Sequence, residues 1–290
     1  MGSSQSWKNR TAVISGGSNG LGRALALALS QQSANVVIIG RDENRLAMVR
    51  QQCLEAGAPN VWIVSLDVRQ MAVGKRALAD IETATHPEPG ESLRDVLAVQ
   101  GCDLLINAVG KSDRGLLGQL TQADLTEQFD LNVLATHAMT QFCFAALCQS
   151  RGVVVNIASL AGIIPGPGMG GYSMSKHALV GLHRQWRIES DSSGVHFLLV
   201  CPGPIQREDT LDRYADIVHS RGLDPASQRP GGGVALNRLD PMWLSQKILQ
   251  AAFERKSELI VPTKARLLAL LMTIWPSLAD RIIRKKMKRT

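Results

Sequence analysis

The chain has 290 residues, of which 45% are hydrophobic, and 32 lysines and arginines against 25 aspartates and glutamates give a net charge of +7. This length and composition fit a globular chain of one or two domains, and they exclude a disordered chain, a collagen and a disulfide-stabilised scaffold. The charge leaves nucleic acids and membrane surfaces open as partners. Residues 264–290 hold eight basic residues and one acidic residue, so the first 263 residues are neutral overall.

Short apolar runs alternate with segments of helical periodicity as far as residue 262. Runs of β-branched residues such as 36–39 are typical of strands that are buried on both faces. The alternation predicts an α/β domain with a parallel sheet of about seven strands and helices on both faces. The predicted strands are 11–15, 35–39, 61–66, 103–107, 153–157, 196–201 and 259–261. The predicted helices are 21–32, 43–56, 73–84, 125–149, 172–191 and 241–255.

The cysteines and the N-terminus bear on the cellular compartment. The five cysteines are an odd number without metal-ligand spacing, so we expect buried free thiols in a reducing compartment. The N-terminus lacks the cationic and apolar regions of a signal peptide. The apolar run 267–275 stops at Pro276, well short of the roughly 20 residues of a membrane span. We therefore expect a cytoplasmic protein.

A glycine-rich turn lies between the first predicted strand and the first predicted helix. Its glycines allow a tight turn, the close approach of a pyrophosphate and the packing of the helix on the strand. The helix N-terminus supplies N–H groups and a partial positive charge for phosphate oxygens. The residues of this turn that we expect to bind a dinucleotide are Ser15, Gly16, Ser18, Asn19, Gly20, Leu21 and Gly22.

The end of the second predicted strand bears on the choice between NAD and NADP. NAD sites usually carry an acid there for the ribose 2′-hydroxyl, whereas NADP sites offer an arginine to the 2′-phosphate. Gly40 occupies the position of the acid, and Arg41 follows it. The sequence therefore favours NADP(H) over NAD. Asp42 comes next and is expected to be the N-cap of the following helix.

A tyrosine and a lysine four residues apart form the centre of the candidate catalytic site. Tyr172 and Lys176 share one helix face, and an ammonium group near a phenol lowers the pKa of the phenol. Ser159 lies 13 residues before Tyr172, just beyond a predicted strand, and Asn132 lies 27 residues before Ser159.

In these motifs and their order the chain resembles the short-chain dehydrogenase/reductase (SDR) family, over about residues 10–262. Asn132, Ser159, Tyr172 and Lys176 match the catalytic tetrad of the family. The resemblance implies a single Rossmann-type doubly wound sheet, a homodimer or homotetramer, and no metal. The further positions that the resemblance assigns to cofactor binding are Asp67, Val68, Asn107, Gly110, Pro202 and Gly203.

The resemblance also implies a role for each residue of the tetrad. Tyr172 would be the general acid in carbonyl reduction or the base in alcohol oxidation, and Ser159 would hydrogen-bond the substrate oxygen. Lys176 would bind the nicotinamide ribose and lower the Tyr172 pKa, so these two residues also belong to the cofactor site. Asn132 would hold a water that relays protons to Lys176.

The chain departs from the family pattern at two positions, each in a segment that follows a predicted strand. Ala108 replaces an asparagine, which is expected to loosen a contact between neighbouring strands. Arg207 stands where the family has a threonine near the carboxamide, and Thr210 follows three residues later. The segment 204–237, which contains both, is polar and rich in proline and glycine, and we expect it to be a functional or mobile loop.

Residues 263–290 are predicted to form a basic, amphipathic helical extension to the catalytic domain 1–262. Ser277 is expected to be the N-cap of a helix with one apolar and one basic face. Such a helix, with Trp275 nearby, suits the anionic surface at the inner face of a membrane. The alternatives are a helix that covers the substrate pocket and one that packs on a sister subunit. A nucleic acid is not expected, because the body is neutral and carries no binding motif.

The leading functional hypothesis is an NADP(H)-dependent oxidoreductase that interconverts a carbonyl and a secondary alcohol. An apolar substrate, such as a steroid-, sphingoid- or acyl-like ketone, would suit the amphipathic extension. The alternatives are a 3-oxoacyl-thioester reductase and a cofactor-binding regulator without catalysis.

Overall fold

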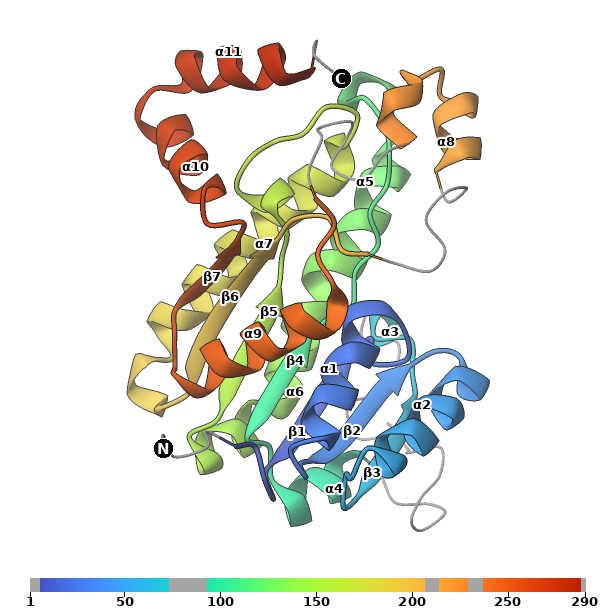
Figure 1. The fold of residues 1–290 in the computed structure, drawn as a ribbon, viewed down its shortest axis with the longest axis vertical. Coiled ribbons are helices and arrows are strands. Elements are labelled where there is room, and N and C mark those ends of the chain that lie inside the picture. The colour runs from blue at the N-terminus through green and yellow to red at the C-terminus, as the bar shows by residue number, and fades with distance from the viewer. Residues whose placement is uncertain (1–5, 73–92, 207–213, 229–236, 288–290) are drawn as a thin grey trace.

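Within the residues that the structure describes, 6–72, 93–206, 214–228 and 237–287 of a computed structural model, seven parallel strands form one sheet (Figure 1). The strand order is β3-β2-β1-β4-β5-β6-β7, which places β1 at the point where the order reverses. This confirms the predicted α/β fold. The strands are β1 (Thr11–Ser15), β2 (Asn35–Gly40), β3 (Val61–Ser65), β4 (Leu104–Asn107), β5 (Val153–Ile157), β6 (His196–Pro202) and β7 (Glu258–Val261).

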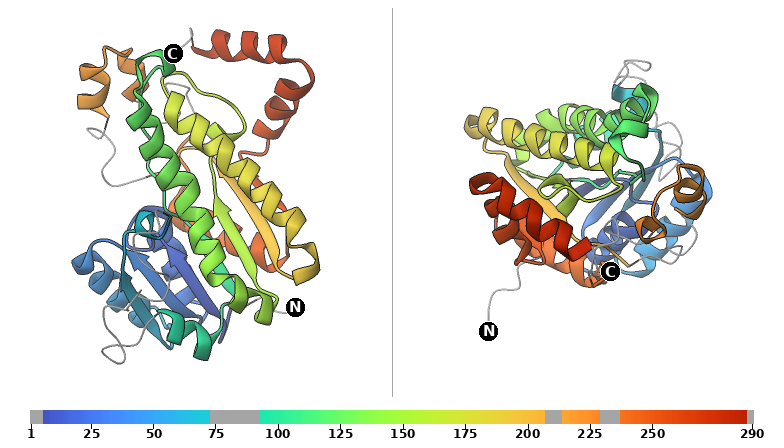
Figure 2. Two further views of the ribbon diagram at one scale, coloured as in Figure 1. Left: turned by 180° about the vertical axis from the view of Figure 1, so that it is seen from behind. Right: turned by 90° about the horizontal axis from the view of Figure 1, so that it is seen from above.

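Helices cover both faces of the sheet (Figure 2). Neighbouring residues of β1 point to opposite faces, so that Ile14 and Val13 belong to two separate halves of the apolar core. One face carries α1 (Gly20–Ser30), α2 (Glu43–Glu55) and α9 (Pro241–Phe253), and the other carries α4 (Leu93–Gln100), α6 (Ala135–Ser150) and α7 (Gly170–Glu189).

The five cysteines are free, as predicted. Four of them are buried, whereas Cys148 is partly exposed.

The predicted helix 125–149 starts earlier than expected and is not uniform. It begins as α5 (Gln122–Phe129), passes through a π-helical turn, Asp130–Leu134, and continues as α6. By length and composition, the stretch Gln122–Ser150 could cross a membrane, but half of its apolar window is buried inside the protein. Its apolar residues pack against the sheet, which makes it a core helix of this fold.

Short helices account for the other differences from the prediction. α4 has only eight residues, too few to give a clear periodic pattern. The segment 204–237, expected to be a loop, contains α8 (Ala215–Ser220) and a 3₁₀ turn, Pro225–Gln228. The predicted helix 73–84 lies outside the described residues. The short helix α3 (Arg69–Ala72) follows β3.

Two helices follow β7, as the predicted extension requires. α10 (Ala265–Ile274) and α11 (Pro276–Met287) project beyond the sheet at the end of the molecule that also carries α5 and α8 (Figure 1). The prediction that Ser277 is the N-cap is wrong, because α11 begins one residue earlier, at Pro276. Proline suits the first helical position, since its φ is helical and it has no N–H to leave unpaired.

Candidate active site

The turn between β1 and α1 depends on glycine. Gly16 has φ +78°, and a Cβ atom there would lie 2.9 Å from the backbone nitrogen of Val109. A Cβ atom on Gly22 would lie 2.1 Å from the carbonyl oxygen of Gly16, so α1 packs directly on the turn. Gly20 has φ +53°, and its N–H donates to the side chain of Asn19 at 2.6 Å. The N-terminus of α1 therefore lies at the carboxyl edge of the sheet, where a pyrophosphate can bind backbone N–H groups.

Several residues predicted to bind the cofactor have buried side chains. Leu21 and Val68 pack in the two halves of the core, so only their backbone atoms can reach a ligand. Pro202 is the last residue of β6, and the N–H of Gly203 donates to the carbonyl oxygen of Val261 at 2.7 Å. These residues shape the carboxyl edge of the sheet.

A buried chain of polar side chains lies behind the glycine turn. The Ser15 hydroxyl lies 3.3 Å from Oδ1 of Asn107, whose Nδ2 donates to Oδ1 of Asn156 at 2.9 Å. Nδ2 of Asn156 lies 3.2 Å from Nδ1 of His183, and burial lowers the pKa of this histidine to about 3. Ala108, which follows Asn107, packs against the apolar core. Side chains of Ser15, Asn107 and Asn156 thus link β1, β4 and β5.

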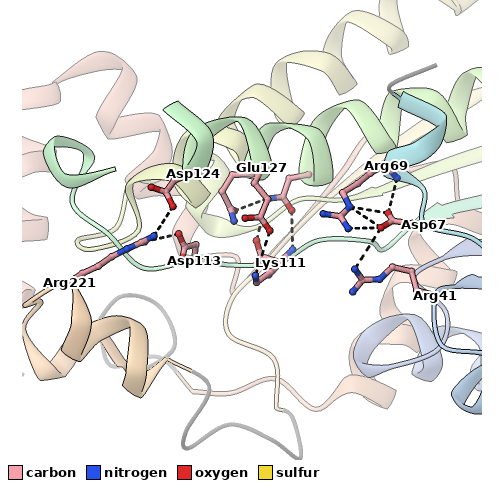
Figure 3. Close-up of polar contacts among 10 residues, drawn as sticks. Arg41, Asp67, Arg69, Lys111, Asp113, Asp124, Glu127 and Arg221 are labelled. Carbon is pink, nitrogen blue, oxygen red and sulfur yellow. Dashed lines mark hydrogen bonds and ion pairs between the residues drawn. The ribbon is translucent and has the colours of Figure 1, made fainter. Parts of the chain in front are cut away.

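Two arginines flank one carboxylate at the ends of β2 and β3 (Figure 3). Asp67 accepts hydrogen bonds from the guanidinium and the N–H of Arg69 at 2.5–3.0 Å, and the guanidinium bonds lower the Asp67 pKa. The Arg41 guanidinium lies 3.8 Å from the same carboxylate, and the Arg41 side chain is 68% exposed. A Cβ atom on Gly40 would meet the Ser18 hydroxyl at 2.8 Å, so this hydroxyl lies at the end of β2. The ends of β2 and β3 therefore carry two guanidinium groups and one carboxylate.

Tyr172 and Lys176 both project from α7, four residues apart. Lys176 is only 3% exposed, and its Nζ donates to the carbonyl oxygen of Ile157, at the end of β5, at 3.0 Å. The same Nζ lies 6.0 Å from the centre of the Tyr172 ring. Burial lowers the pKa of Lys176 to about 8. The Lys176 ammonium therefore lies on the same side of α7 as the Tyr172 ring.

Asn132 belongs to the π-helical turn and reaches the loop after β4. Its Oδ1 accepts from the N–H of Lys111 at 3.2 Å, and its Nδ2 donates to the Ser175 hydroxyl at 3.0 Å. A Cβ atom on Gly110 would lie 2.9 Å from Oδ1 of Asn132 and 3.2 Å from Nζ of Lys176. The structure thus brings Asn132, Lys176 and the loop after β4 together at Gly110.

Ser159 follows β5 and is held against α7. Its hydroxyl oxygen accepts from the N–H of Ala161 at 3.1 Å, which leaves the hydroxyl proton to donate elsewhere. The 3₁₀ turn that it caps, Leu160–Gly162, packs on α7, where the Ser173 hydroxyl donates to the carbonyl oxygen of Ala161 at 2.8 Å. These contacts place Ser159 beside the helix that carries Tyr172.

Sequence reasoning missed an arginine that connects three distant segments (Figure 3). Arg221, at the end of α8, donates to Oδ2 of Asp113 in the loop after β4 and to Oδ1 of Asp124 on α5, at 2.9 Å each. We call these three residues the polar bridge. Arg221 is 108 residues from Asp113 and 97 residues from Asp124 in sequence, so no local pattern could have revealed these contacts.

A second, buried arginine also connects the loop after β4 with the segment around α8. The buried Arg114 donates from Nε to the carbonyl oxygen of Ser227 at 2.7 Å, and its guanidinium lies 3.9 Å from the Tyr214 ring centre. The next residue, Gly115, donates from its N–H to the carbonyl oxygen of Gly168, just before α7, at 2.8 Å. The segments 111–116, 168–170 and 214–228 therefore meet next to the first turn of α7. Arg207 and Thr210 lie outside the described residues.

The buried ammonium of Lys176 predicts a pH-dependent stability. Its pKa is about 10.4 in an unfolded chain and about 8 in the folded protein. Below pH 8 the Lys176 ammonium is charged in both states, so the free energy of unfolding is lowered by the full cost of burying the charge. Above pH 8 the folded protein releases this proton before the unfolded chain does, and the cost falls as the pH rises. Relative to Lys176→Met, we expect wild type to gain about 2–3 kcal/mol of unfolding free energy between pH 7 and pH 10.

Urea unfolding of both proteins at the two pH values, without cofactor, measures this gain. Lys8→Met removes an exposed lysine and serves as the control, with no pH-dependent difference expected. A Lys176→Met effect that is equal at both pH values would contradict a buried, easily deprotonated ammonium.

A glycine turn at the reversal point of a parallel sheet, with a tyrosine–lysine pair across the carboxyl edge, is typical of dinucleotide-dependent oxidoreductases. Residues 10–215 match the sequence profile of the short chain dehydrogenase family, and the chain belongs to this family. It is therefore an oxidoreductase of CH–OH and C=O groups that uses a nicotinamide cofactor.

Individual relatives cover the chain to different extents. Dehydrogenase/reductase SDR family member 7B of Danio rerio is 25% identical over 97% of this chain and 87% of its own length. SDR family member 7 of Homo sapiens and 11-beta-hydroxysteroid dehydrogenase 1A of Arabidopsis thaliana are 30% and 29% identical over 67% and 73% of the chain. The chain spans only 54% and 56% of the lengths of these last two proteins.

Solved structures share the fold at lower identity. An alcohol dehydrogenase from Thermococcus sibiricus in complex with 5-hydroxy-NADP has a TM-score of 0.66 and 21% identity, covering 87% of this chain and 95% of its own. A short-chain dehydrogenase from Streptomyces avermitilis has a TM-score of 0.67 and 22% identity, covering 93% of this chain and 98% of its own.

Proposed function

We propose that this protein is an NADP(H)-dependent oxidoreductase that interconverts a carbonyl and a secondary alcohol, with Tyr172 as the general acid or base. The observation that carries the proposal is the buried ammonium of Lys176, close to both the Tyr172 ring and Asn132. When bound, the nicotinamide supplies or accepts the hydride. The glycine turn suits such a cofactor, because it presents backbone atoms rather than side chains to the pyrophosphate.

Each residue of the tetrad has a defined role in this proposal. Tyr172 gives its hydroxyl proton to the carbonyl oxygen during reduction and takes it back during oxidation. Ser159 directs its free hydroxyl proton at the same oxygen and stabilises the developing negative charge. Lys176 lowers the pKa of Tyr172 and binds the ribose hydroxyls. Asn132 holds a water through which a proton returns to Lys176.

The preference for NADP(H) rests on the charged edge of β2 and β3. Asp67 is already engaged by Arg69, whereas the Arg41 side chain is largely exposed at the end of β2. Its guanidinium and the Ser18 hydroxyl can bind a ribose 2′-phosphate, and Gly40 stands at the position where NAD sites usually carry an acid.

We expect Arg41→Ala to weaken NADPH binding about 10- to 100-fold and to leave NADH binding unchanged, because the lost hydrogen bonds are to a charged phosphate. Fluorescence titration with both cofactors measures the two dissociation constants. Arg45→Ala is the matched control, since Arg45 is exposed nearby and pairs with Asp42. Tighter binding of NADH than of NADPH by the wild type would refute the preference.

The proposed substrate is apolar, such as a steroid-, sphingoid- or acyl-like ketone. Leu116 and Leu117 are exposed in the segment that meets the start of α7, where a Cβ atom on Gly170 would lie 2.9 Å from Cγ of Leu117. Apolar surface beside the first turn of α7, the turn that contains Tyr172, supports an apolar substrate. The name of the Arabidopsis relative, an 11-beta-hydroxysteroid dehydrogenase, supports the same class.

The polar bridge is expected to set the affinity for this substrate. Arg221→Ala removes the hydrogen bonds of the guanidinium to Asp113, to Asp124 and to the carbonyl oxygen of Arg114, and none to the tetrad. We therefore expect KM for the carbonyl substrate to rise about tenfold and kcat to change little. Arg221→Lys, which keeps the charge, should recover part of the loss. An unchanged KM in Arg221→Ala would show that the bridge is not part of the substrate site.

The overall proposal is tested by NADPH oxidation with a steroid ketone, a long-chain 3-keto amine and a 3-oxoacyl thioester. Turnover of either ketone supports the proposal. Turnover of the thioester alone would identify a 3-oxoacyl-thioester reductase. Binding of NADPH without turnover of any carbonyl would identify a regulator that has lost catalysis.

A further inference from the structure

α10 presents an apolar stripe to solvent. Leu267, Leu270 and Ile274 share one helix face and are 72%, 55% and 71% exposed, and the following Trp275 is 60% exposed. No residue of α10 is buried. Among the described residues, the helix packs mainly against α11 and the end of β7. A contiguous exposed apolar stripe of this kind marks an interaction surface.

The basic charge of the protein is concentrated in the same segment. Residues 264–290 carry a net charge of +7, whereas residues 1–263 are neutral. Arg281, Arg284 and Lys285 are exposed and share one face of α11. One of them, Arg284, is partly neutralised by Asp280, the only acidic residue of the segment, at 3.4 Å. The partner of this surface must therefore combine apolar and anionic groups.

We infer that the α10–α11 segment binds the surface of an anionic lipid bilayer. The apolar stripe and Trp275 would enter the boundary between head groups and acyl chains, while the basic face of α11 contacts the anionic head groups. A second copy of the chain fits this surface less well, because it would bring two segments of charge +7 together and its neutral body offers no compensating charge. The inner faces of the two helices pack on each other, with Ala279 fully buried, so the surface is already formed.

Flotation with phosphatidylcholine vesicles, with and without phosphatidylserine, tests the inference on the full chain. We expect binding only to the phosphatidylserine vesicles, and weaker binding as the salt concentration rises. The triple variant Arg281→Ala, Arg284→Ala, Lys285→Ala should bind about 100-fold more weakly. Leu267→Gln with Leu270→Gln should also weaken binding, because the two changes remove two of the three side chains of the apolar stripe.

Matched controls carry the same changes on the body of the protein. Lys8→Ala, Arg94→Ala and Lys247→Ala remove three exposed charges, and Val99→Gln replaces an apolar side chain that is 74% exposed. These variants should float like the wild type, and NADPH binding should be unchanged in all of them.

Three outcomes would overturn the inference. Equal flotation of the wild type and both α10–α11 variants would place the lipid contact elsewhere. Dimers that dissociate on Leu267→Gln, without vesicle binding by the wild type, would identify a second copy as the partner. A changed KM for a water-soluble carbonyl without any vesicle binding would identify α10 and α11 as a cover for the substrate pocket.

Discussion

Tyr172→Phe is expected to lower kcat about a thousandfold while NADPH binds as tightly as it does to the wild type. The phenylalanine ring keeps the packing on α7 and the position beside the Lys176 ammonium, 6.0 Å from the ring centre. What the substitution removes is the hydroxyl proton that the proposed mechanism transfers to the carbonyl oxygen. Steady-state NADPH oxidation and a fluorescence titration of NADPH separate the two effects.

The chain supplies its own control, because it contains only one other tyrosine. Tyr214→Phe also removes a single hydroxyl, which bonds to the Ser112 hydroxyl in the segment near the polar bridge. We expect this variant to raise KM and to keep most of kcat. Full activity of Tyr172→Phe would remove the tyrosine from the mechanism, and equal losses in both variants would point to a structural rather than a chemical effect.

Local spacing explains why the candidate residues of the site could be named from the sequence. Tyr172 and Lys176 are four positions apart on a helix and so share one face. The glycines of the first turn are required by the close contact of α1 with the backbone of Gly16. The strands could be predicted because their β-branched runs are buried on both faces, which leaves continuous apolar stretches in the sequence.

What could not be predicted depends on contacts between distant residues. The π-helical turn that carries Asn132 has the same apolar pattern as the helices on either side, so the pattern alone predicts one regular helix. The polar bridge joins Arg221 to residues about 100 positions away. The sequence around each of its residues would look the same if their side chains were exposed and did not meet. The low pKa of Lys176 likewise follows from its burial, not from its position in the motif.

Gly22→Ala is expected to weaken NADPH binding at least about 100-fold, the second large effect that the structure predicts. The added Cβ atom would lie 2.1 Å from the carbonyl oxygen of Gly16 and 2.8 Å from its carbonyl carbon. Both neighbours are backbone atoms of the turn, so neither can rotate away. The turn must open or α1 must move outward, and either change displaces the N–H groups that are expected to bind the pyrophosphate.

Two alanine substitutions elsewhere separate this clash from a general loss of glycine. Gly20→Ala meets no atom within 4 Å but has φ +53°, so it should cost about 1–2 kcal/mol of stability and weaken NADPH binding less than Gly22→Ala does. Gly181→Ala, on the exposed side of α7, meets no atom and should stabilise the protein by up to about 1 kcal/mol. Urea unfolding and NADPH titration give both quantities for each variant. If a folded Gly22→Ala protein binds NADPH like the wild type, the cofactor does not lie on this turn.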